Sequence, residues 1–492
     1  MMHDVEQSES PIVALKSSNK AEGSVAETME PRGDAKRNAG QATTCQTPSW
    51  ESVSPGLERI RESARANPKL RFNALLHHVT PELLRMAYLS LKRNAAAGVD
   101  GVTWDGYGKD LEKKLMDLHG RIHRGAYRAL PSRRRMIPKP DGRERPLGIA
   151  SLEDKIVQRA VVEVLNAIYE ADFFGFSYGY RPGRSQHDAL DALAYAIERK
   201  KVSWILDADL RSYFDTVNHD WLIRFLEERI GDQRIIRLIR KWLKAGVMED
   251  GITRATVVGT PQGGVASPLL SNIYLHYCFD QWVHQWRRRY AHGEVITVRY
   301  ADDFVVGFQH KDDAEAFLAD LEKRMKKFGL SLHPNKTRLI EFGRFAAERR
   351  AQRRIGKPET FTFLGFRHIC GTSRTGRFTL VRQTHKDRMR RALQAVKEQM
   401  HKRMHDTIPK QGRWLGRVVR GYFAYHAVPT NSRKIGAFRW DIVRIWRHVL
   451  KRQGQQGFPR WKRMRDLAEQ WLPPVRVMHP WPTQRFIVNH SR

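Results

Sequence analysis

The chain has 492 residues, and 87 Lys and Arg against 53 Asp and Glu give it a formal net charge of +34. A charge this large favours a polyanionic partner, because each cation placed on a phosphate releases condensed counterions. The three cysteines lie far apart in the sequence, which argues against a disulfide framework and a cysteine zinc site. No apolar run is long enough to span a bilayer, so no membrane partner is expected.

The first half of the chain predicts helices interrupted by one strand pair. Residues 1–56 are rich in Ser, Glu, Ala, Gly and Thr without sustained periodicity, and we expect them to have little order. A helical pattern starts at Leu57. The stretch "PSRRRMIPKPDGRERPLG" predicts two strands joined by a turn at Asp141–Gly142. The following "SLEDKIVQRAVVEVLNAIYE" predicts an amphipathic helix with Ser151 as its N-cap.

The second half alternates strands and helices without a regular repeat. "VSWILDADL" and "VITVRYADDFVVGF" read as strands, and "KDDAEAFLADLEKRMKKFGL" predicts an amphipathic helix that ends near Gly329. "FTFLGF" predicts a short strand, and from about Gln383 the pattern is helical again. This mixed order of elements predicts an α+β fold.

Five carboxylates are candidates for chemistry. Asp207 and Asp209 end an apolar run and share one face by strand alternation, Asp215 follows at the start of a turn or helix, and Asp302 and Asp303 lie between two apolar runs. Such a group repels itself unless a cation lies among its members, and hard oxygen ligands suit Mg²⁺. Two such ions can activate an attacking hydroxyl and stabilise a leaving oxygen. The alternative reading of Asp302–Asp303 is a polar hairpin turn.

The context of the aspartate pair resembles a known family. Tyr300–Ala301–Asp302–Asp303 resembles the YxDD signature of reverse transcriptases. Further blocks stand in the order found in group II intron-encoded proteins: "AAGVDGVT", "IPKPDGRERPLGI", "FSYGYRPGRSQHDAL", "DADLRSYFD", "GTPQGGVASPLLSNIYL", "GLSLHPNKT" and "FTFLGF". The resemblance runs from about Leu70 to the carboxy terminus and weakens after Arg460. Ordered blocks are far more specific than a single YADD.

The resemblance implies a right-hand polymerase fold. The low-order extension 1–56 would precede α+β fingers and palm over residues 57–370. An all-α thumb and maturase domain would cover 371–470, and a tail would cover 471–492.

The resemblance also implies the residues of a polymerase site. The Asp209, Asp302 and Asp303 carboxylates and the Leu210 carbonyl would hold two Mg²⁺ ions, whereas salt bridging or capping suits Asp207 and Asp215 better. The residues expected to contact the incoming nucleotide are Lys139, Arg145, Phe214, Gln262 and Lys336. Phe214 would reject a 2′-hydroxyl by its bulk, and a place in the core is its alternative role. The expected primer grip is Phe363, Leu364 and Gly365, which a plain core strand explains almost as well.

The carboxy-terminal region is strongly basic. From His401 to Arg492 the chain has 20 Lys and Arg against 4 Asp and Glu, interleaved with aromatic residues. Such surfaces bind RNA through phosphate contacts and stacking, although many of these aromatics, at helical spacing, belong in a core. The residues expected on the RNA face are Arg413, Arg417, Arg420, Arg439 and Arg447.

The implied function is RNA-directed DNA synthesis coupled to binding and splicing of a parent group II intron RNA. The expected partners are that RNA, an RNA template, a DNA primer or target and dNTPs, in a bacterial cytoplasm, with retrohoming by cDNA synthesis. No cysteine follows Cys370 and the tail is short, so an endonuclease-less type is expected. The alternatives are a non-enzymatic splicing factor, another bacterial reverse transcriptase and a viral-type RNA-dependent RNA polymerase, which usually has Gly where Tyr300–Ala301 leads into the aspartates. Intact Asp209, Asp302, Phe214 and Gln262 oppose the first, and the long basic region opposes the second.

Overall fold

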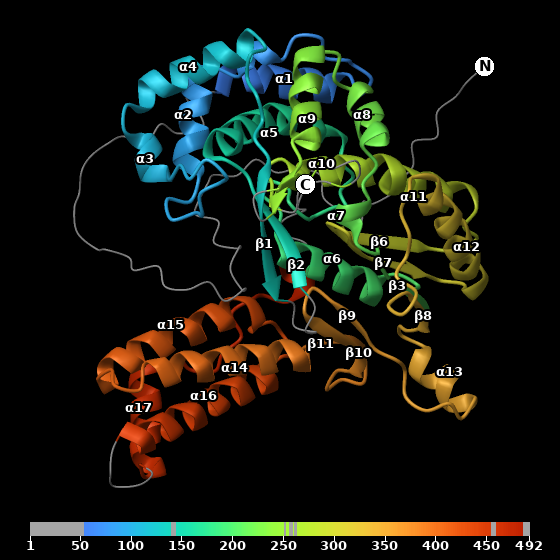
Figure 1. Cartoon of the computed structure of the whole chain (residues 1–492). Coiled ribbons are helices and arrows are strands. Elements are labelled where there is room, and N and C mark those ends of the chain that lie inside the picture. The colour runs from blue at the N-terminus through green and yellow to red at the C-terminus, as the bar shows by residue number, and fades with distance from the viewer. Residues whose placement is uncertain are drawn as a thin grey trace.

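The computed structural model describes residues 54–138, 144–249, 252–254, 259, 263–453 and 459–485. The described residues form three sheets, and Figure 1 shows at one end of the molecule a group of helices formed by the last part of the chain. Helices and strands are mixed along the sequence, as predicted. In the described ranges, no helix combines the length and the apolar character needed to cross a membrane.

The amino-terminal elements are helical and pack on one long helix. They are α1 (Ser54–Ala66), η1 (Leu76–His78), α2 (Pro81–Ser90), α3 (Trp104–Gly108) and α4 (Leu111–His123), and the long helix is α5 (Leu152–Asp172). The predicted N-cap is confirmed, because the Ser151 hydroxyl accepts a hydrogen bond from the Asp154 amide. The apolar side of α5 is buried along its length in the largest core of the molecule.

A four-stranded sheet, of which β1 and β2 are drawn below α5 in Figure 1, lies in the region predicted as fingers. Its strands are β1 (Ser132–Pro138), β2 (Glu144–Ile149), β4 (Val247–Glu249) and β5 (Ile252–Arg254), in the order β2-β1-β4-β5. Strands β1 and β2 pair antiparallel, as the sequence predicted. The predicted turn at Asp141–Gly142 lies outside the described residues.

The palm is built on a second, fully antiparallel sheet. Its strands are β3 (Trp204–Asp209), β6 (Val295–Tyr300), β7 (Asp303–Phe308) and β8 (Arg338–Glu341), in the order β6-β7-β3-β8. Both faces are apolar. Ile205 and Val305 pack in one core with α6 (Gln186–Arg199), whereas Leu206 and Val306 belong to the other core with α12 (Lys311–Lys327). The predicted helix α12 is confirmed, and Gly329 follows it with a φ of 72°.

Further helices belong to this part of the described chain. They are α7 (Tyr213–Thr216), α8 (His219–Glu227), α9 (Gln233–Lys244), α10 (Ser267–Leu275), the π-helical segment η2 (His276–Asp280), α11 (Gln281–Arg289) and α13 (Ala346–Gln352).

A third sheet connects the palm to the carboxy-terminal helices. It contains β9 (Phe361–Phe363), β10 (Phe366–Thr372) and β11 (Phe378–Thr384) in the order β11-β10-β9. The block "FTFLGF", predicted as one strand, is a strand followed by a turn, because Leu364 and Gly365 have φ values of 48° and 77°. Two consecutive residues with positive φ make the tight turn that suits a twisted hairpin. The predicted boundary at residue 370 falls inside β10, and the chain becomes helical only after Thr384.

The carboxy-terminal helices have a core of their own. Helices α14 (Lys386–Lys402), α15 (Ile408–His426), α16 (Ser432–Gln453) and α17 (Trp461–Trp471) each contribute buried residues to it. The helical character predicted for this region is therefore confirmed. Two buried groups of α15 and α16 are also joined, since the Trp446 indole donates to the Gln411 side chain at 2.8 Å.

Candidate active site

Three of the predicted acidic residues meet at one end of the palm sheet. Asp209 on β3 is the register partner of Asp303 on β7, and Asp303 also pairs with Tyr300 across the β6–β7 hairpin. The turn of that hairpin is Ala301–Asp302, where Ala301 has a φ of 57°. The sequence prediction that distant segments bring these carboxylates together is confirmed by this register.

The carboxylates raise one another's proton affinity. The pKa of Asp303 lies well above its usual range, because its environment is desolvated and because Asp207, Asp302 and Asp209 add negative charge. A hydrogen bond from the backbone amide of Leu364 partly offsets this shift. The cluster therefore carries excess negative charge, which a cation would relieve.

Asp207 is held by neighbouring protein groups. Its carboxylate lies 3.3 Å from the Arg338 guanidinium, and the Thr362 backbone amide also bonds to it. Burial raises the pKa of Asp207 in spite of these partners. The salt-bridging role predicted for this residue is confirmed.

The carboxylates of the cluster are suitable ligands for Mg²⁺, but they do not form a complete, preformed metal site. Within the described ranges, no three His, Cys, Asp or Glu side chains are arranged to hold a metal ion together. The Lys336 ammonium contacts the Asp209 carboxylate, and both side chains are partly exposed to solvent. Mg²⁺ commonly takes one or two carboxylates and completes its octahedron with waters and substrate phosphates. The carboxylate pair is therefore suitable for the ion, provided that Lys336 moves off Asp209.

The backbone adds an oxygen on the same side. Leu210 forms an antiparallel bridge with Leu332. The hydrogen bonds of this bridge are made by the neighbouring residues, and in one of them the His333 amide donates to the Asp209 carbonyl at 2.8 Å. In such a pair the carbonyl of the bridged residue points away from the partner segment. The Leu210 carbonyl is thereby directed to the side on which β7 and its hairpin lie.

Two of the predicted blocks lie against each other beside the acids. Phe214 on α7 is half-buried, and its ring packs edge-on against that of the buried Tyr213 at 5.4 Å. A Cβ added at Gly259 would lie 2.9 Å from the Phe214 carbonyl oxygen, and the Gly259 amide bonds to the Val217 carbonyl at 2.8 Å. The absence of a side chain at Gly259 therefore lets the "GTPQGG" block approach the turn that carries Phe214. Lys139, Gln262 and the side chain of Arg145 lie outside the described residues.

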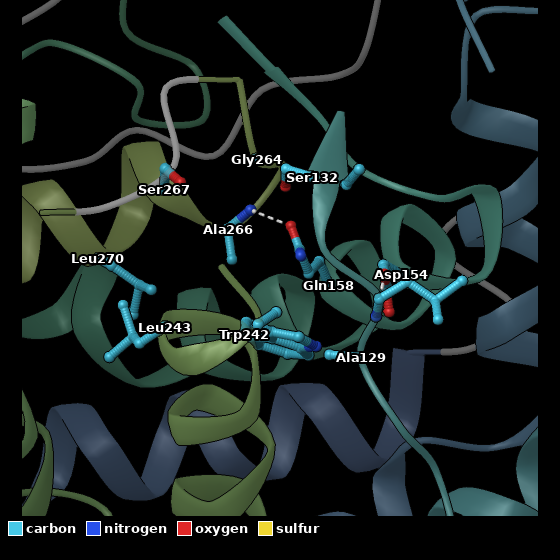
Figure 2. A pocket seen from close by; sticks show the side chains of 13 residues that line it. Ala129, Ser132, Asp154, Gln158, Trp242, Leu243, Gly264, Ala266, Ser267 and Leu270 are labelled. Carbon is cyan, nitrogen blue, oxygen red and sulfur yellow. Dashed lines mark hydrogen bonds between the residues drawn. The ribbon is translucent and has the colours of Figure 1, made fainter. Parts of the chain in front are cut away.

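The far end of the same block is fixed against the fingers. Figure 2 shows a small cavity between β1, α5, α9 and the start of α10. Its volume is about 20 Å³. In it the Gln158 side chain accepts a hydrogen bond from the Ala266 amide at 3.2 Å. A Cβ at Gly263 would lie 2.7 Å from the Gly148 carbonyl oxygen of β2. The sequence analysis did not identify Gln158. The signal that could have found it was a polar residue on the buried face of a predicted helix.

The predicted primer grip forms a turn rather than a continuous strand. Phe363 is a core residue, whereas Leu364 and Gly365 make the turn. The Leu364 amide bonds to Asp303, and the Leu364 carbonyl accepts from the Tyr425 hydroxyl of α15 at 2.7 Å. The turn thus connects the acidic cluster with the carboxy-terminal helices.

A buried arginine behind the β6–β7 hairpin was also missed. Arg299 is fully buried and forms an ion pair with Asp280, and it donates to the Ala301 carbonyl at 2.9 Å and to the Ser177 hydroxyl at 2.7 Å. The bond to Ala301 fixes the residue with the left-handed backbone that forms the turn. Arg299 therefore supports Asp302 from behind. The signal was a cation inside an otherwise apolar strand, "VITVRY".

The predicted RNA-facing arginines fall into two groups. Arg413, Arg417 and Arg420 are exposed on one side of α15, at spacings of about one turn. Arg439 instead donates to the Pro473 and Ala468 carbonyls at 3.0 and 2.9 Å, and Arg447 donates to the Pro459 carbonyl at 2.9 Å. The latter two stabilise the contact between α16 and α17.

Comparisons with known proteins agree with this geometry. The family model of reverse transcriptase (RNA-dependent DNA polymerase) matches residues 137–368. Protein YkfC of Escherichia coli (strain K12) is 35% identical over 367 residues, which cover 67% of this chain and 91% of that protein.

Two further relatives have names that refer to introns. Group II intron-encoded protein LtrA of Lactococcus lactis subsp. cremoris is 33% identical over 306 residues, or 59% of this chain and 50% of the relative. Nuclear intron maturase 4, mitochondrial, of Arabidopsis thaliana is 27% identical over 227 residues, or 44% of this chain and 26% of the relative. The chain thus spans half of LtrA and about a quarter of the plant maturase. The chain belongs to the reverse transcriptases, RNA-dependent DNA polymerases, and among them to the group II intron reverse transcriptases and maturases.

Proposed function

We propose that the chain copies an RNA template into DNA at the end of the palm sheet where Asp209 and Asp302 lie. The observation that carries this proposal is the convergence of the Asp209–Asp303 pair, the Phe214 turn and the Leu364–Gly365 turn on one spot. These segments are distant in the sequence and have no shared packing reason to gather three acids. A non-enzymatic RNA-binding protein would not need them.

Asp209 and Asp302, with the Leu210 carbonyl, would hold two Mg²⁺ ions. When bound, these ions supply charge neutralisation for the phosphates and activation of the primer hydroxyl. Asp303 has a raised pKa and a hydrogen bond to Leu364, and it supports the other two acids and positions the primer-contacting turn. Lys336 leaves Asp209 when phosphates arrive, and its ammonium is then available to the departing pyrophosphate.

Phe214 would line the sugar of the incoming nucleotide. It is the half-buried aromatic residue of the α7 turn, five positions after Asp209, and its ring would leave no space for a 2′-hydroxyl. This arrangement would select dNTPs over rNTPs by steric exclusion.

The exposed arginines of α15 would bind the parent intron RNA and stabilise its folded form during splicing. This RNA-binding role is supported by the position of Arg413, Arg417 and Arg420, which lie on an exposed helical face in a strongly basic region. Synthesis of cDNA on that RNA from a DNA primer would then support retrohoming.

Primer extension on an RNA template tests the polymerase proposal. We expect the wild-type protein to incorporate dNTPs in the presence of Mg²⁺, and Asp302→Asn to lose extension while binding the same RNA with unchanged affinity. The matched control is Asp312→Asn, an exposed acid of α12. If Asp302→Asn extends the primer as well as the wild type does, the assignment of the site is wrong.

Substitution of Phe214 by Val tests the selection of the sugar. We expect the variant to incorporate rNTPs at least about tenfold more efficiently relative to dNTPs, which corresponds to about 1.4 kcal/mol. The ratio of kcat/KM for dATP and ATP measures the change. An unchanged ratio in a folded variant would mean that Phe214 is a packing residue.

A further inference from the structure

An exposed pair of stacked tryptophans lies on the carboxy-terminal helices. Trp440 of α16 and Trp461 of α17 have ring centroids 5.0 Å apart and planes 15° from parallel, and they are 51% and 38% exposed. By contrast, Trp446 and Tyr422 are buried in the core of these helices, and Trp414 and Trp471 are partly buried against it. Sequence periodicity alone did not distinguish the two kinds.

The ring of Trp461 contacts two side chains of α16. Besides Trp440, the Arg447 guanidinium lies over it, 4.3 Å from the ring centroid. Trp440 and Arg447 are seven residues apart, which is about 10.5 Å along a helix. The two stacking distances account for most of that spacing. Two turns of α16 between a tryptophan and an arginine therefore hold one flat ring.

The same spacing occurs on the opposite side of Trp440. Arg433 is exposed and precedes Trp440 by seven residues, again about 10.5 Å. Between them, one turn before Trp440, lie Gly436 and the exposed Ala437, which have no side chain larger than a methyl group. A Cβ added at Gly436 would lie 3.9 Å from Val475, its one near neighbour. We call the region bounded by Arg433, Ala437 and Trp440 the α16 slot.

The charge around the α16 slot indicates the kind of ligand. Helix α16 has seven Lys and Arg against a single Asp. Arg444, one turn after Trp440, is also exposed, as are Lys462 and Arg465 on α17. Aromatic faces bordered by cations bind single strands of nucleic acid, because every base has a flat face and every nucleotide a phosphate. A base held in a duplex is already stacked on both sides and would have to be unstacked first.

We propose that the α16 slot binds one unpaired base of an RNA strand, stacked on Trp440, with its phosphates held by Arg433 and Arg444. This proposal rests on the proposed RNA-binding function and adds a defined subsite to it. The site is separate from the exposed arginines of α15. It would recognise a loop or bulge by the accessibility of its base rather than by its sequence.

The test compares binding of two labelled RNAs by anisotropy: a hairpin with an unpaired loop that contains 2-aminopurine, and the same stem as a blunt duplex. We expect Trp440→Ala to weaken binding of the looped RNA about five- to a hundredfold, the range for loss of one stacked base. Binding of the duplex should change less than twofold. Trp440→Phe should retain most of the affinity, and 2-aminopurine fluorescence should be quenched by the wild type but not by Trp440→Ala.

The matched control is Trp481→Ala, since Trp481 is 52% exposed but lies outside the slot; this variant should bind both RNAs as the wild type does. Arg433→Glu provides a second variant that leaves the aromatic pair intact and should also weaken binding of the looped RNA. Equal affinity of Trp440→Ala and wild type for the looped RNA would overturn the proposal. So would a loss of self-association, measured by sedimentation, with unchanged RNA binding, because the slot would then serve a second copy of the chain.

Primer extension with the same wild-type preparation separates this inference from the proposed function. Failure of extension by the wild type counts against the polymerase proposal alone. Extension by the wild type, together with unchanged binding by Trp440→Ala and Arg433→Glu, counts against the slot alone.

Discussion

Two arginines around the palm sheet are buried against carboxylates, whereas three arginines of helix α15 lie at the surface. In the palm, Arg299 pairs with Asp280 and Arg181 with Glu170, and both arginines are 5% exposed or less. On α15, by contrast, Arg413, Arg417 and Arg420 are exposed. A buried cation persists only with a partner, because the cost of desolvation is large. The surplus charge of the chain is therefore available for RNA chiefly where the cations are exposed.

The largest change in stability is expected from breaking a buried ion pair of the palm. Arg299→Gln leaves the Asp280 carboxylate buried without its counter-charge, which costs about 3–5 kcal/mol of unfolding free energy. Urea denaturation measures this loss. Arg417→Gln on α15 is the matched control and should change stability by less than about 0.5 kcal/mol.

A double variant separates stability from positioning. Replacing both partners, as in Arg299→Met with Asp280→Leu, should recover much of the stability, since an apolar pair of similar volume is often neutral. Primer extension should stay low, because the hydrogen bond to the Ala301 carbonyl is still lost. Recovery of both stability and extension would mean that Arg299 has no role in positioning the catalytic hairpin.

Reversal of the exposed charges should act on RNA binding and not on folding. With Arg413, Arg417 and Arg420 all changed to Glu, we expect RNA affinity to fall at least about tenfold. The slope of log affinity against log salt should decrease by about 2, since each phosphate contact contributes about 0.7 on a single strand. The melting temperature should change little.

The control for this triple variant lies on the palm. Lys323, Lys326 and Lys327 of α12 are exposed, and their change to Glu alters the net charge by the same amount. Equal losses of RNA affinity in the two triple variants would show that total charge matters and that α15 has no special role.

Much of the site was predictable because local patterns carry it. The alternation around Asp209, the apolar runs around Asp302 and the helix start at Ser151 depend on neighbours in the sequence. The roles of Arg299, Gln158 and Trp440 depend on segments far away in the chain, such as the π-helical turn that carries Asp280. Arg439 illustrates the same limit, since its exposure depended on where residues 468–473 pack. Burial of a cation or an aromatic is a tertiary property that spacing alone does not determine.

The two regions meet at a histidine contact, which permits a smaller test. His187 of α6 stacks on His479 of the carboxy-terminal segment at 3.9 Å, and Arg485 of that segment bonds to Asp191 at 3.1 Å. His479 also bonds to the Ala424 carbonyl of α15 at 2.8 Å, so the segment joins palm and helices.

Burial, together with the positive charge of the neighbouring His479, Arg485, Arg382 and His426, lowers the pKa of His187 to about 2. Since its folded pKa lies below the unfolded value near 6.5, the unfolded chain binds more protons in acid, and stability is lost as the pH falls through 6.5. Between pH 7 and 5.5 this histidine should account for a loss of about 1 kcal/mol. His187→Phe keeps a flat ring against His479 without the proton, so its unfolding free energy should fall by about 1 kcal/mol less over the same range. Other buried histidines contribute equally to both proteins, so the difference between the two pH profiles isolates His187. Parallel profiles would show that the contact between palm and carboxy-terminal segment tolerates a charged His187.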